Sequence, residues 1–490
     1  MRQKVNIHIL WYGMAGAVLL CSIAVGFVLK NRTPPSKILC KDCNIILISL
    51  DTLGADHLPC YGYGRDTAPH LCAFAHDNIL FRRSYANATY TLPTHVSLFT
   101  GLLPTHHGIT SVGTTKLPES VPFLFSILKE HGYSTIFVSD ENNPHMPIDR
   151  VYYRGIDERL SLGNRPWTKA ISLFTQRALQ GEKTFLFIHS YFVHPPYTDE
   201  DTANLYTSDY FGWMYLRERD KIDISPDFIT NTRIELAVDL KNRVHSGPAP
   251  YQHVFDQLVQ FADNNDAARR VLLDNPKILD EYRDRYDPLI RLDPANEREM
   301  SYLKAIYDQR IHKLDSEVLL ELLNVYKQPE IRKNTILLII SDHGEEFGEH
   351  GFTSHSSLYN QNTDVVTIMA VPGVASRQID TPVQTADFTP TILSLVGIPY
   401  SYRFDGMDIT PLFFGAKVSD RILVAEREHE LTLRYGKWKL FVAKNGGSYT
   451  PIALYDVLSD PRESKDMLFT NLSFAKMLIR MYQAQFSSGR

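Results

Sequence analysis

Two acidic residues of the chain stand directly after hydrophobic runs rich in isoleucine and leucine. Asp51 follows residues 44–50 (NIILISL), and Asp342 with His343 follows residues 335–341 (TILLIIS). A carboxylate at the end of a buried segment is costly unless it is paired, caps a helix or binds a cation. Two carboxylates and an imidazole are ligands that suit Mn²⁺, Zn²⁺, Ca²⁺ or Mg²⁺. The pattern therefore predicts one divalent cation held by Asp51, Asp342 and His343.

A threonine lies between these acidic residues, at the start of the segment Thr91–His95 (TLPTH). A threonine before a helix is normally an N-terminal cap, and this is one interpretation of Thr91. The other places its hydroxyl at the helix N-terminus, where backbone N–H groups and the helix dipole attract an anionic ester. A bound cation would lower the pKa of the hydroxyl, so Thr91 is predicted to be both nucleophile and metal ligand.

The predicted elements bring the two acidic residues to one edge of a sheet. Continuous apolar runs at residues 44–50, 184–189 and 335–340 are typical of strands buried on both faces. Helical patterns over residues 123–131 and 302–326 lie between them. The alternation predicts an α/β fold with a mostly parallel central sheet flanked by helices. Such sheets carry their chemistry in the loops after the carboxyl ends of strands, which is where both acidic residues lie.

The same patterns divide the chain into parts. Residues 44–400 carry the alternation and are predicted to form the catalytic domain, with a charge-rich helical insertion at about residues 198–300. From residue 401 the strand patterns are shorter and amphipathic, and a helical pattern follows them. Residues 401–490 are therefore predicted to form a small C-terminal α+β subdomain.

The N-terminal segment has the character of a membrane anchor. Residues 7–29 contain no aspartate, glutamate, lysine or arginine, and basic residues flank them on both sides. An apolar run of about 20 residues spans a bilayer as a helix. We therefore predict that residues 1–32 form an uncleaved single-pass anchor in the lipid bilayer, with the catalytic domain outside the cytoplasm. A cleaved signal peptide and a buried core helix are the alternatives.

The composition excludes several classes of protein. The 490 residues carry a net charge of −5 without a long basic run, which argues against a dedicated nucleic-acid binder. A hydrophobic fraction of 44% excludes a wholly disordered chain. The five cysteines are too few for a disulfide-built scaffold of this size. Cys40 with Cys43, and Cys60 with Cys72, fit two local disulfides in an oxidising compartment; free thiols or a zinc site are the alternatives.

Several short motifs occur in order between residues 44 and 467, and together they resemble the sulfatase branch of the alkaline phosphatase superfamily. They are Leu50-Asp51, Cys60–Tyr63 (CYGY), Thr91–His95 (TLPTH), Pro104–Gly108 (PTHHG), Ser341–Glu345 (SDHGE), Gly348–Gly351 (GEHG), Asp405-Gly406, and Leu454–Asp456 (LYD) with Asp460-Pro461. One of these motifs alone is weak, whereas the ordered set is specific. The resemblance implies that superfamily's α/β fold and a metal-dependent reaction on a phosphate or sulfate ester.

The resemblance also implies roles for the residues around the predicted cation. Asp51, Asp342 and His343 match metal ligands, and Thr91 stands where the family places its nucleophile. Sulfatases usually carry cysteine, sometimes serine, at that position and convert it to formylglycine, a conversion that is not expected of threonine. Thr52 stands where many sulfatases have a second liganding aspartate.

Four further residues are implied to meet the substrate. His194 matches a substrate-binding histidine, and His355 matches one that contacts the ester or protonates the leaving group. Lys116 falls near a lysine that contacts phosphate or sulfate. His95 stands where sulfatases carry an arginine four positions after the nucleophile, and it is likewise expected to bind substrate.

These departures favour the members of the superfamily that transfer phosphoryl groups through a threonine. The predicted function is therefore a membrane-anchored, extracytoplasmic, metal-dependent hydrolase or transferase that acts on phosphate monoesters or diesters through Thr91. One alternative is a sulfuric ester hydrolase that acts on sugar or glycan sulfates without formylglycine. A second alternative is a catalytically silent binding scaffold.

Overall fold

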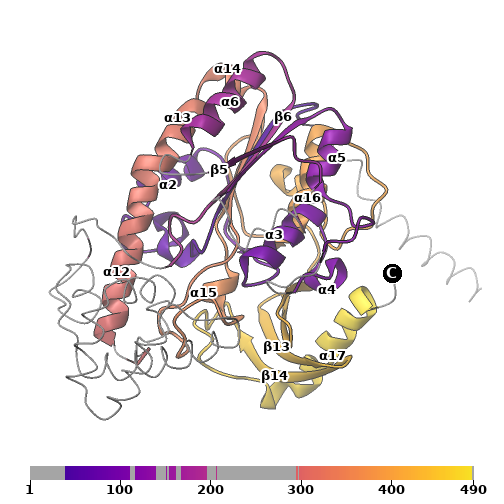
Figure 1. The fold of residues 1–490 in the computed structure, drawn as a ribbon. Helices are drawn as coiled ribbons and strands as arrows, with labels where there is room; N and C mark the ends of the chain where they lie inside the picture. Colours follow the sequence, from indigo (N-terminus) through magenta and orange to yellow (C-terminus); the bar gives the residue numbers. More distant parts are fainter. Residues whose placement is uncertain are drawn as a thin grey trace, which may run out of the picture.

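The computed structural model describes residues 39–110, 116–139, 154–161, 167–195 and 297–487, together with residues 151, 206, 294 and 295. Its centre is an eight-stranded sheet (Figure 1), in the order β5 (Glu158–Ser161), β4 (Ser134–Ser139), β6 (Thr184–Ser190), β1 (Asn44–Leu50), β7 (Thr335–Ser341), β8 (Thr367–Ala370), β2 (Ile79–Phe81) and β9 (Arg377–Ile379). β8 runs antiparallel to both of its neighbours, and the other pairings are parallel. The predicted mostly parallel sheet is therefore confirmed.

The three central strands are the apolar runs of the sequence. Every residue of β6, β1 and β7 is buried. The reason is that helices cover both faces of the sheet, so neither face of these strands is exposed to solvent. Alternate residues of β1 point to opposite faces. Ile46 and Ile48 belong to the hydrophobic core on one face, and Ile45 and Leu47 belong to the core on the other.

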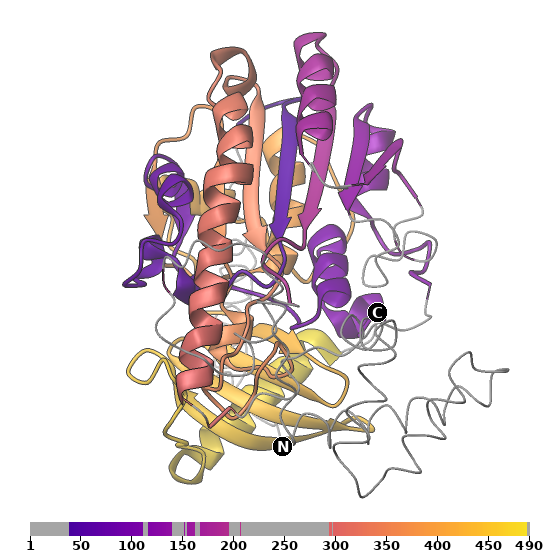
Figure 2. The same ribbon diagram turned by 60° about the vertical axis from the view of Figure 1, so that its left-hand side comes forward.

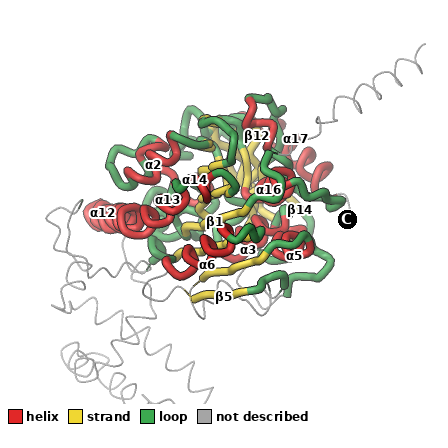
Figure 3. The backbone as a smooth tube through the Cα atoms, turned by 90° about the horizontal axis from the view of Figure 1, so that it is seen from above, coloured by secondary structure: helices red, strands yellow, loops and turns green. Residues whose placement is uncertain are grey.

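Helices form a layer on each face of the sheet, as the views in Figures 2 and 3 show. The first layer consists of α2 (Pro69–His76), α6 (Thr168–Leu179), α12 (Glu297–Lys313), α13 (Leu320–Tyr326) and α14 (Pro329–Arg332). The second consists of α3 (Thr91–Thr100), α5 (Leu124–Glu130) and α16 (Phe388–Val396). A π-helical stretch, Leu314–Leu319, joins α12 to α13, so the helix predicted over residues 302–326 is one helical run in the structure.

Short elements connect the layers. They are the two-stranded sheet of β3 (Ser84–Tyr85) and β10 (Val383–Gln384), the single turns α4 (Pro104–His107) and α15 (Asn360–Thr363), the 3₁₀ segments Ala55–His57, Pro59–Tyr61, Thr385–Asp387, Thr410–Phe414 and Phe469–Asn471, and the π-helical segment Gln483–Ser487. The predicted helical insertion at about residues 198–300 lies almost entirely outside the described residues.

A second sheet follows at the C-terminal end and lies below the large sheet in Figures 1 and 2. It is antiparallel and contains β11 (Leu423–Glu426), β12 (Glu430–Tyr435), β13 (Trp438–Asn445) and β14 (Ser448–Asp456), with α17 (Leu472–Tyr482) packed against it. The sequence reasoning missed β14, which contains Pro451. A proline cannot donate to a β-ladder, but it is tolerated in β14 because this strand lies at the edge of the sheet.

Two disulfides join the cysteine pairs that are close in sequence, Cys40 with Cys43 and Cys60 with Cys72. This is the pairing predicted for an oxidising compartment. The predicted anchor at residues 1–32 lies outside the described residues. Within the part of the chain that is described, no helix combines the length and the apolar character needed to cross a bilayer.

A buried acid on β11 makes the stability of the fold depend on pH. Glu426 is 1% exposed, and its cationic neighbour, the Lys444 ammonium, lies 3.8 Å from Oε2. Burial outweighs the influence of Lys444 and raises the pKa of Glu426 from 4.5 to about 7. Because the folded protein keeps this proton to a higher pH than the unfolded chain, the free energy of unfolding should fall as the pH rises from about 4.5 to about 7.

We therefore expect Glu426→Gln to raise the free energy of unfolding by about 1–3 kcal/mol at about pH 8. The gain should disappear at about pH 4, where the glutamate is protonated in both states. Urea denaturation of both proteins at the two pH values measures the difference. A gain of equal size at both would contradict the assignment.

Candidate active site

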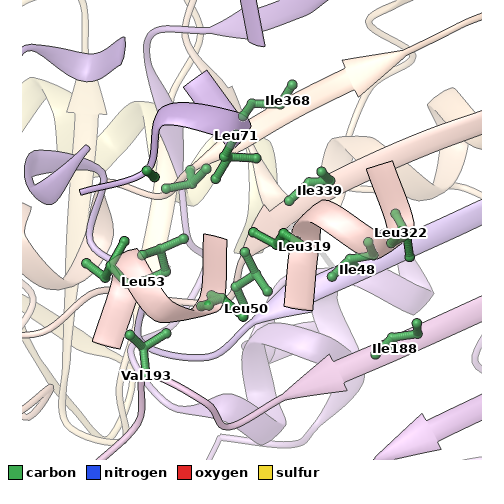
Figure 4. Close-up of a cluster of buried hydrophobic side chains, with 14 of the residues drawn as sticks. Ile48, Leu50, Leu53, Leu71, Ile188, Val193, Leu319, Leu322, Ile339 and Ile368 are labelled. Carbon is green, nitrogen blue, oxygen red and sulfur yellow. The ribbon is translucent and has the colours of Figure 1, made fainter. Parts of the chain in front are cut away.

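The candidate site lies where the three central strands end. Because β6, β1 and β7 run parallel and side by side, their carboxyl ends bring His189, Asp51 and Asp342 to one edge of the sheet. Figure 4 shows part of the hydrophobic core behind this edge, where side chains from these strands and from the covering helical layer lie together: Ile48, Leu50, Ile188, Leu319, Leu322 and Ile339. Close packing gives the polar groups at the strand ends a rigid base.

The three strand-end residues predicted to bind metal form a buried group. Asp51, Asp342 and His343 place potential ligand atoms within 4.8 Å of one another. His343 Nε2 lies 3.5 Å from Asp342 Oδ2 and 3.7 Å from Asp51 Oδ1. Neither of these two oxygens accepts a hydrogen bond from the described residues. Two buried, negatively charged oxygens without hydrogen-bond donors are suitable ligands for a divalent cation. Asp51, Asp342 and His343 therefore fit the cation that the sequence predicts.

The electrostatics of this group agree with that fit. Burial, reinforced by the neighbouring Asp51 carboxylate, raises the pKa of Asp342 to about 7. The two carboxylates are held together by the turn after β1, where Thr52 has a positive φ of 58°. This conformation is strained for a β-branched residue. It lets the Thr52 N–H donate to Asp342 Oδ1 over 3.2 Å, and the Thr52 hydroxyl donates to the Asp51 carbonyl.

Thr91 enters the site as the first residue of α3. The residue at the N-terminal cap is Tyr90, and no side chain caps this helix. The Thr91 hydroxyl instead donates to Asp51 Oδ2 over 3.2 Å. The structure therefore departs from the capping interpretation and places the hydroxyl beside the group that fits a cation, as a nucleophile and a metal ligand require.

His95 is placed differently from its expected role in substrate binding. It is fully buried, its Nδ1 lies 2.7 Å from the Thr91 carbonyl oxygen, and its Nε2 lies 2.8 Å from Ser49 Oγ. Burial lowers the pKa of His95 to about 3, so the ring is neutral. With Nδ1–H donating to the carbonyl and Nε2 accepting from the hydroxyl, neither nitrogen is left for substrate. The geometry favours a role in holding the first turn of α3 against β1.

His189 is a site residue that the sequence reasoning missed. It lies near the end of β6, it is fully buried, and its Nε2 is 3.0 Å from Asp51 Oδ2. Together with His95 and Asp342 it forms a second group of potential metal ligands, but the two hydrogen bonds of His95 argue against its use. The sequence did contain an indication of this role, because His189 lies near the end of the apolar run TFLFIHS. A polar residue at the carboxyl end of a buried parallel strand lies at the sheet edge where active sites form.

The two histidines predicted to meet substrate lie next to the candidate metal group. The His355 ring centroid is 4.5 Å from that of His343 and 5.5 Å from that of His194. Burial lowers the pKa of His194 to about 4, so this ring is neutral near physiological pH. Arg310 of α12 donates to the His194 carbonyl over 3.0 Å and so fixes the loop after β6. The structure brings these histidines together, and their catalytic roles stay predictions.

Lys116 differs from the other predicted site residues. It is exposed, in the segment between α4 and α5, whereas Asp51, Thr91 and Asp342 are buried. Its contact with the ester stays a prediction that the geometry does not strengthen.

Comparisons with known proteins identify the family. The sulfatase family model matches residues 43–398. Over 86% of its length, the chain is 23% identical to a choline-sulfatase of Rhizobium meliloti and 24% identical to a Delta 4,5-hexuronate-2-O-sulfatase of Bacteroides thetaiotaomicron, covering 81% and 84% of those proteins. Its fold is similar to that of a phosphonate monoester hydrolase of Agrobacterium radiobacter, with a TM-score of 0.61 and 16% identity over 91% of this chain and 96% of that one. Because the family model covers most of the chain, this protein belongs to the sulfatase family.

Proposed function

We propose that this sulfatase-family hydrolase acts on phosphate monoesters or diesters, with Thr91 as its nucleophile. The observation that carries the proposal is the position of the Thr91 hydroxyl, at the N-terminus of α3 and 3.2 Å from Asp51, beside the buried group of Asp51, Asp342 and His343. A hydroxyl at a helix N-terminus, next to a group that fits a cation, suits attack on an anionic ester.

In the proposed reaction, residues of the site release or accept each proton that moves. Thr91 Oγ1 attacks phosphorus, its proton passes to Asp51 Oδ2, and the bond from phosphorus to the leaving oxygen breaks as His355 donates a proton to that oxygen. Water or an alcohol then attacks the phosphoryl-threonine and gives its proton to His355, while Asp51 returns the first proton to Thr91. Neutral His194 would donate a hydrogen bond to a non-bridging oxygen. A cation held by Asp51, Asp342 and His343 would supply Lewis-acid stabilisation of the negative charge.

The chemistry of threonine supports a phosphoryl-enzyme rather than a modified residue. Formylglycine is an aldehyde, which forms from a side chain whose Cβ carries two hydrogens. The Cβ of Thr91 carries a methyl group, so its oxidation would yield a ketone. The unmodified hydroxyl is therefore the group available for attack.

A sulfuric ester hydrolase is the second candidate. The names of the two sequence relatives favour it, since one is a choline-sulfatase and the other a hexuronate-2-O-sulfatase. The same hydroxyl and the same buried group would serve a sulfate ester, because the charge distribution of its transition state also needs stabilisation at non-bridging oxygens.

We further propose that the protein is anchored in the membrane through residues 1–32, with the catalytic domain outside the cytoplasm. The apolar segment at residues 7–29 and its basic flanks support this placement. The two disulfides are consistent with an oxidising compartment.

The test compares three chromogenic esters with the full-length protein in detergent, supplied with each candidate cation in turn. The esters are bis(4-nitrophenyl) phosphate, 4-nitrophenyl phosphate and 4-nitrophenyl sulfate. We expect the phosphate esters to be turned over faster than the sulfate, and intact mass after a rapid acid quench to show a phosphoryl group on Thr91. Preference for the sulfate would favour the second candidate, and absence of turnover and of bound metal would favour a silent scaffold.

A further inference from the structure

A buried tyrosine of α12 contacts the turn that follows β1 and has no role in the mechanism described so far. The Tyr307 hydroxyl donates a hydrogen bond to the Thr52 carbonyl over 2.5 Å and accepts one from the Gly54 N–H over 2.8 Å. Tyr307 is fully buried, and its ring packs against His57 and Phe347 at centroid distances of 4.8 Å and 4.9 Å. One hydroxyl therefore joins two residues of this turn to a helix that is distant in the sequence.

The turn needs such a partner because its conformation is unfavourable. Thr52 has a φ of 58°, and it is the only β-branched residue among the described non-glycine residues with positive φ, which are Asp42, Thr52, Ser354 and Glu463. A residue with a branched side chain keeps this conformation only where the surrounding structure holds it in place. The Tyr307 hydroxyl is one of the groups that hold Thr52.

The strained form of the turn is the one that places the predicted metal ligands. Asp51 directly precedes Thr52, and the Thr52 N–H donates to Asp342 Oδ1 over 3.2 Å. The other oxygen of that carboxylate, Asp342 Oδ2, lies 3.5 Å from His343 Nε2. If Thr52 relaxed to a negative φ, its N–H would turn away from Asp342, and Asp51 would shift with it. Tyr307 is thus linked to two of the three predicted ligands through Thr52.

We propose that Tyr307 is a positioning residue for the cation, because it holds the turn after β1 so that the Asp51 and Asp342 carboxylates are arranged for binding before the ion arrives. This inference rests on the proposed function, which assigns a cation to Asp51, Asp342 and His343. A preorganised group binds more tightly because less rearrangement accompanies binding. Partners that orient metal ligands commonly contribute about 10- to 100-fold to metal affinity.

The test measures cation affinity in the absence of substrate. Full-length protein in detergent is stripped of metal with a chelator, dialysed and titrated calorimetrically with Mn²⁺, Zn²⁺, Ca²⁺ and Mg²⁺ in turn. Tyr307→Phe keeps the ring and removes only the hydroxyl. We expect it to weaken binding of the cation that the wild type binds most tightly by about 10- to 100-fold. Turnover of bis(4-nitrophenyl) phosphate should then require a correspondingly higher cation concentration.

Tyr326→Phe is the matched control. Tyr326 belongs to α13 of the same helical run and is also buried. Its hydroxyl donates to the Thr335 carbonyl over 3.2 Å, at the end of β7 opposite Asp342. Loss of this hydroxyl should lower the melting temperature, while cation affinity should stay within about twofold of the wild type because the two sites are far apart.

Thr52→Gly tests whether strain is the reason for the effect. Glycine adopts a positive φ without steric cost, so a turn with glycine depends less on an external partner. In the Thr52→Gly background, Tyr307→Phe should therefore weaken cation binding by less than about threefold.

Three outcomes would overturn the positioning role. They are unchanged cation affinity in Tyr307→Phe, an equal loss of affinity in Tyr326→Phe, and an undiminished loss in the Thr52→Gly background. A wild type that bound no cation would refute the cation assignment and the positioning role together. Failure of the proposed substrate is distinguishable, because the wild type would then bind a cation but turn over neither phosphate ester, and the comparison of cation affinities would still stand.

Discussion

Replacing Thr91 with valine is expected to lower the turnover of a phosphate ester by about 10²-fold or more, while the protein stays folded. Valine keeps the branched shape of threonine but has no hydroxyl, so no bond from oxygen to phosphorus can form. The side chain is buried, and its hydroxyl donates a hydrogen bond to Asp51. Its loss should lower the free energy of unfolding by only about 1 kcal/mol.

Two variants separate chemistry from structure in this experiment. Thr91→Ser keeps the hydroxyl and should stay within about tenfold of the wild-type rate. Thr94→Val removes another buried hydroxyl of α3, which donates to the Ala88 carbonyl over 2.9 Å, and should leave turnover nearly unchanged. Steady-state kinetics, thermal denaturation and intact mass after quenching are the measurements. A folded Thr91→Val protein with wild-type turnover would exclude a covalent route through this residue.

The second large effect is expected when one carboxylate of the buried group is removed. Asp342→Asn should lower activity by about 10²-fold or more and abolish the rise in thermal stability that a bound cation produces. With cation bound, the wild type should be the more stable protein. In the presence of a chelator we expect the opposite, with Asp342→Asn melting at a higher temperature than the wild type. The reason is that Asp342 and Asp51 are buried like charges, and this burial and repulsion raise the pKa of Asp342 to about 7.

Asp308→Asn is the matched control for this reversal. Asp308 is also fully buried, but it accepts hydrogen bonds from His57, Tyr63 and Arg65, outside the candidate metal group. Its replacement should lower the melting temperature with and without cation, and the cation-dependent rise should persist. The measurements are thermal denaturation with a chelator or with each of Mn²⁺, Zn²⁺, Ca²⁺ and Mg²⁺, and metal content by mass spectrometry. Unchanged metal content in Asp342→Asn would contradict the assignment.

The strand framework was predictable because its signal is local. Residues 44–50, 184–189 and 335–340 are almost continuously apolar, and this pattern is typical of strands covered on both faces. The structure extends the second and third runs to Ser190 and Ser341 and confirms the parallel arrangement. The edge strand β14 escaped prediction because an edge position tolerates polar residues and Pro451.

For some of the predicted site residues the sequence indicated the correct surroundings, and for His95 it did not. Asp51, Asp342 and Thr91 converge as expected, since parallel strands and the N-terminus of a covering helix meet at one edge. His95 has the residue type of a ligand or a substrate contact, yet its i−4 hydrogen bond to the Thr91 carbonyl and its contact with Ser49 occupy both nitrogens. A histidine pattern in sequence does not reveal which partner each nitrogen finds.

The sequence by itself determined the chemical inventory of this protein: which strands are buried, which residues follow them, and that a threonine stands at the position proposed for the nucleophile. These properties reside in residue type and local order. Only the tertiary structure decided that His189 contacts Asp51, that Glu345 contacts His355, and that Lys116 is exposed. Such partnerships depend on strand order and on how loops pack at the sheet edge. Some of these contacts join segments that are distant in the chain, and others depend on the conformation of a single loop. Local sequence patterns therefore do not predict these contacts.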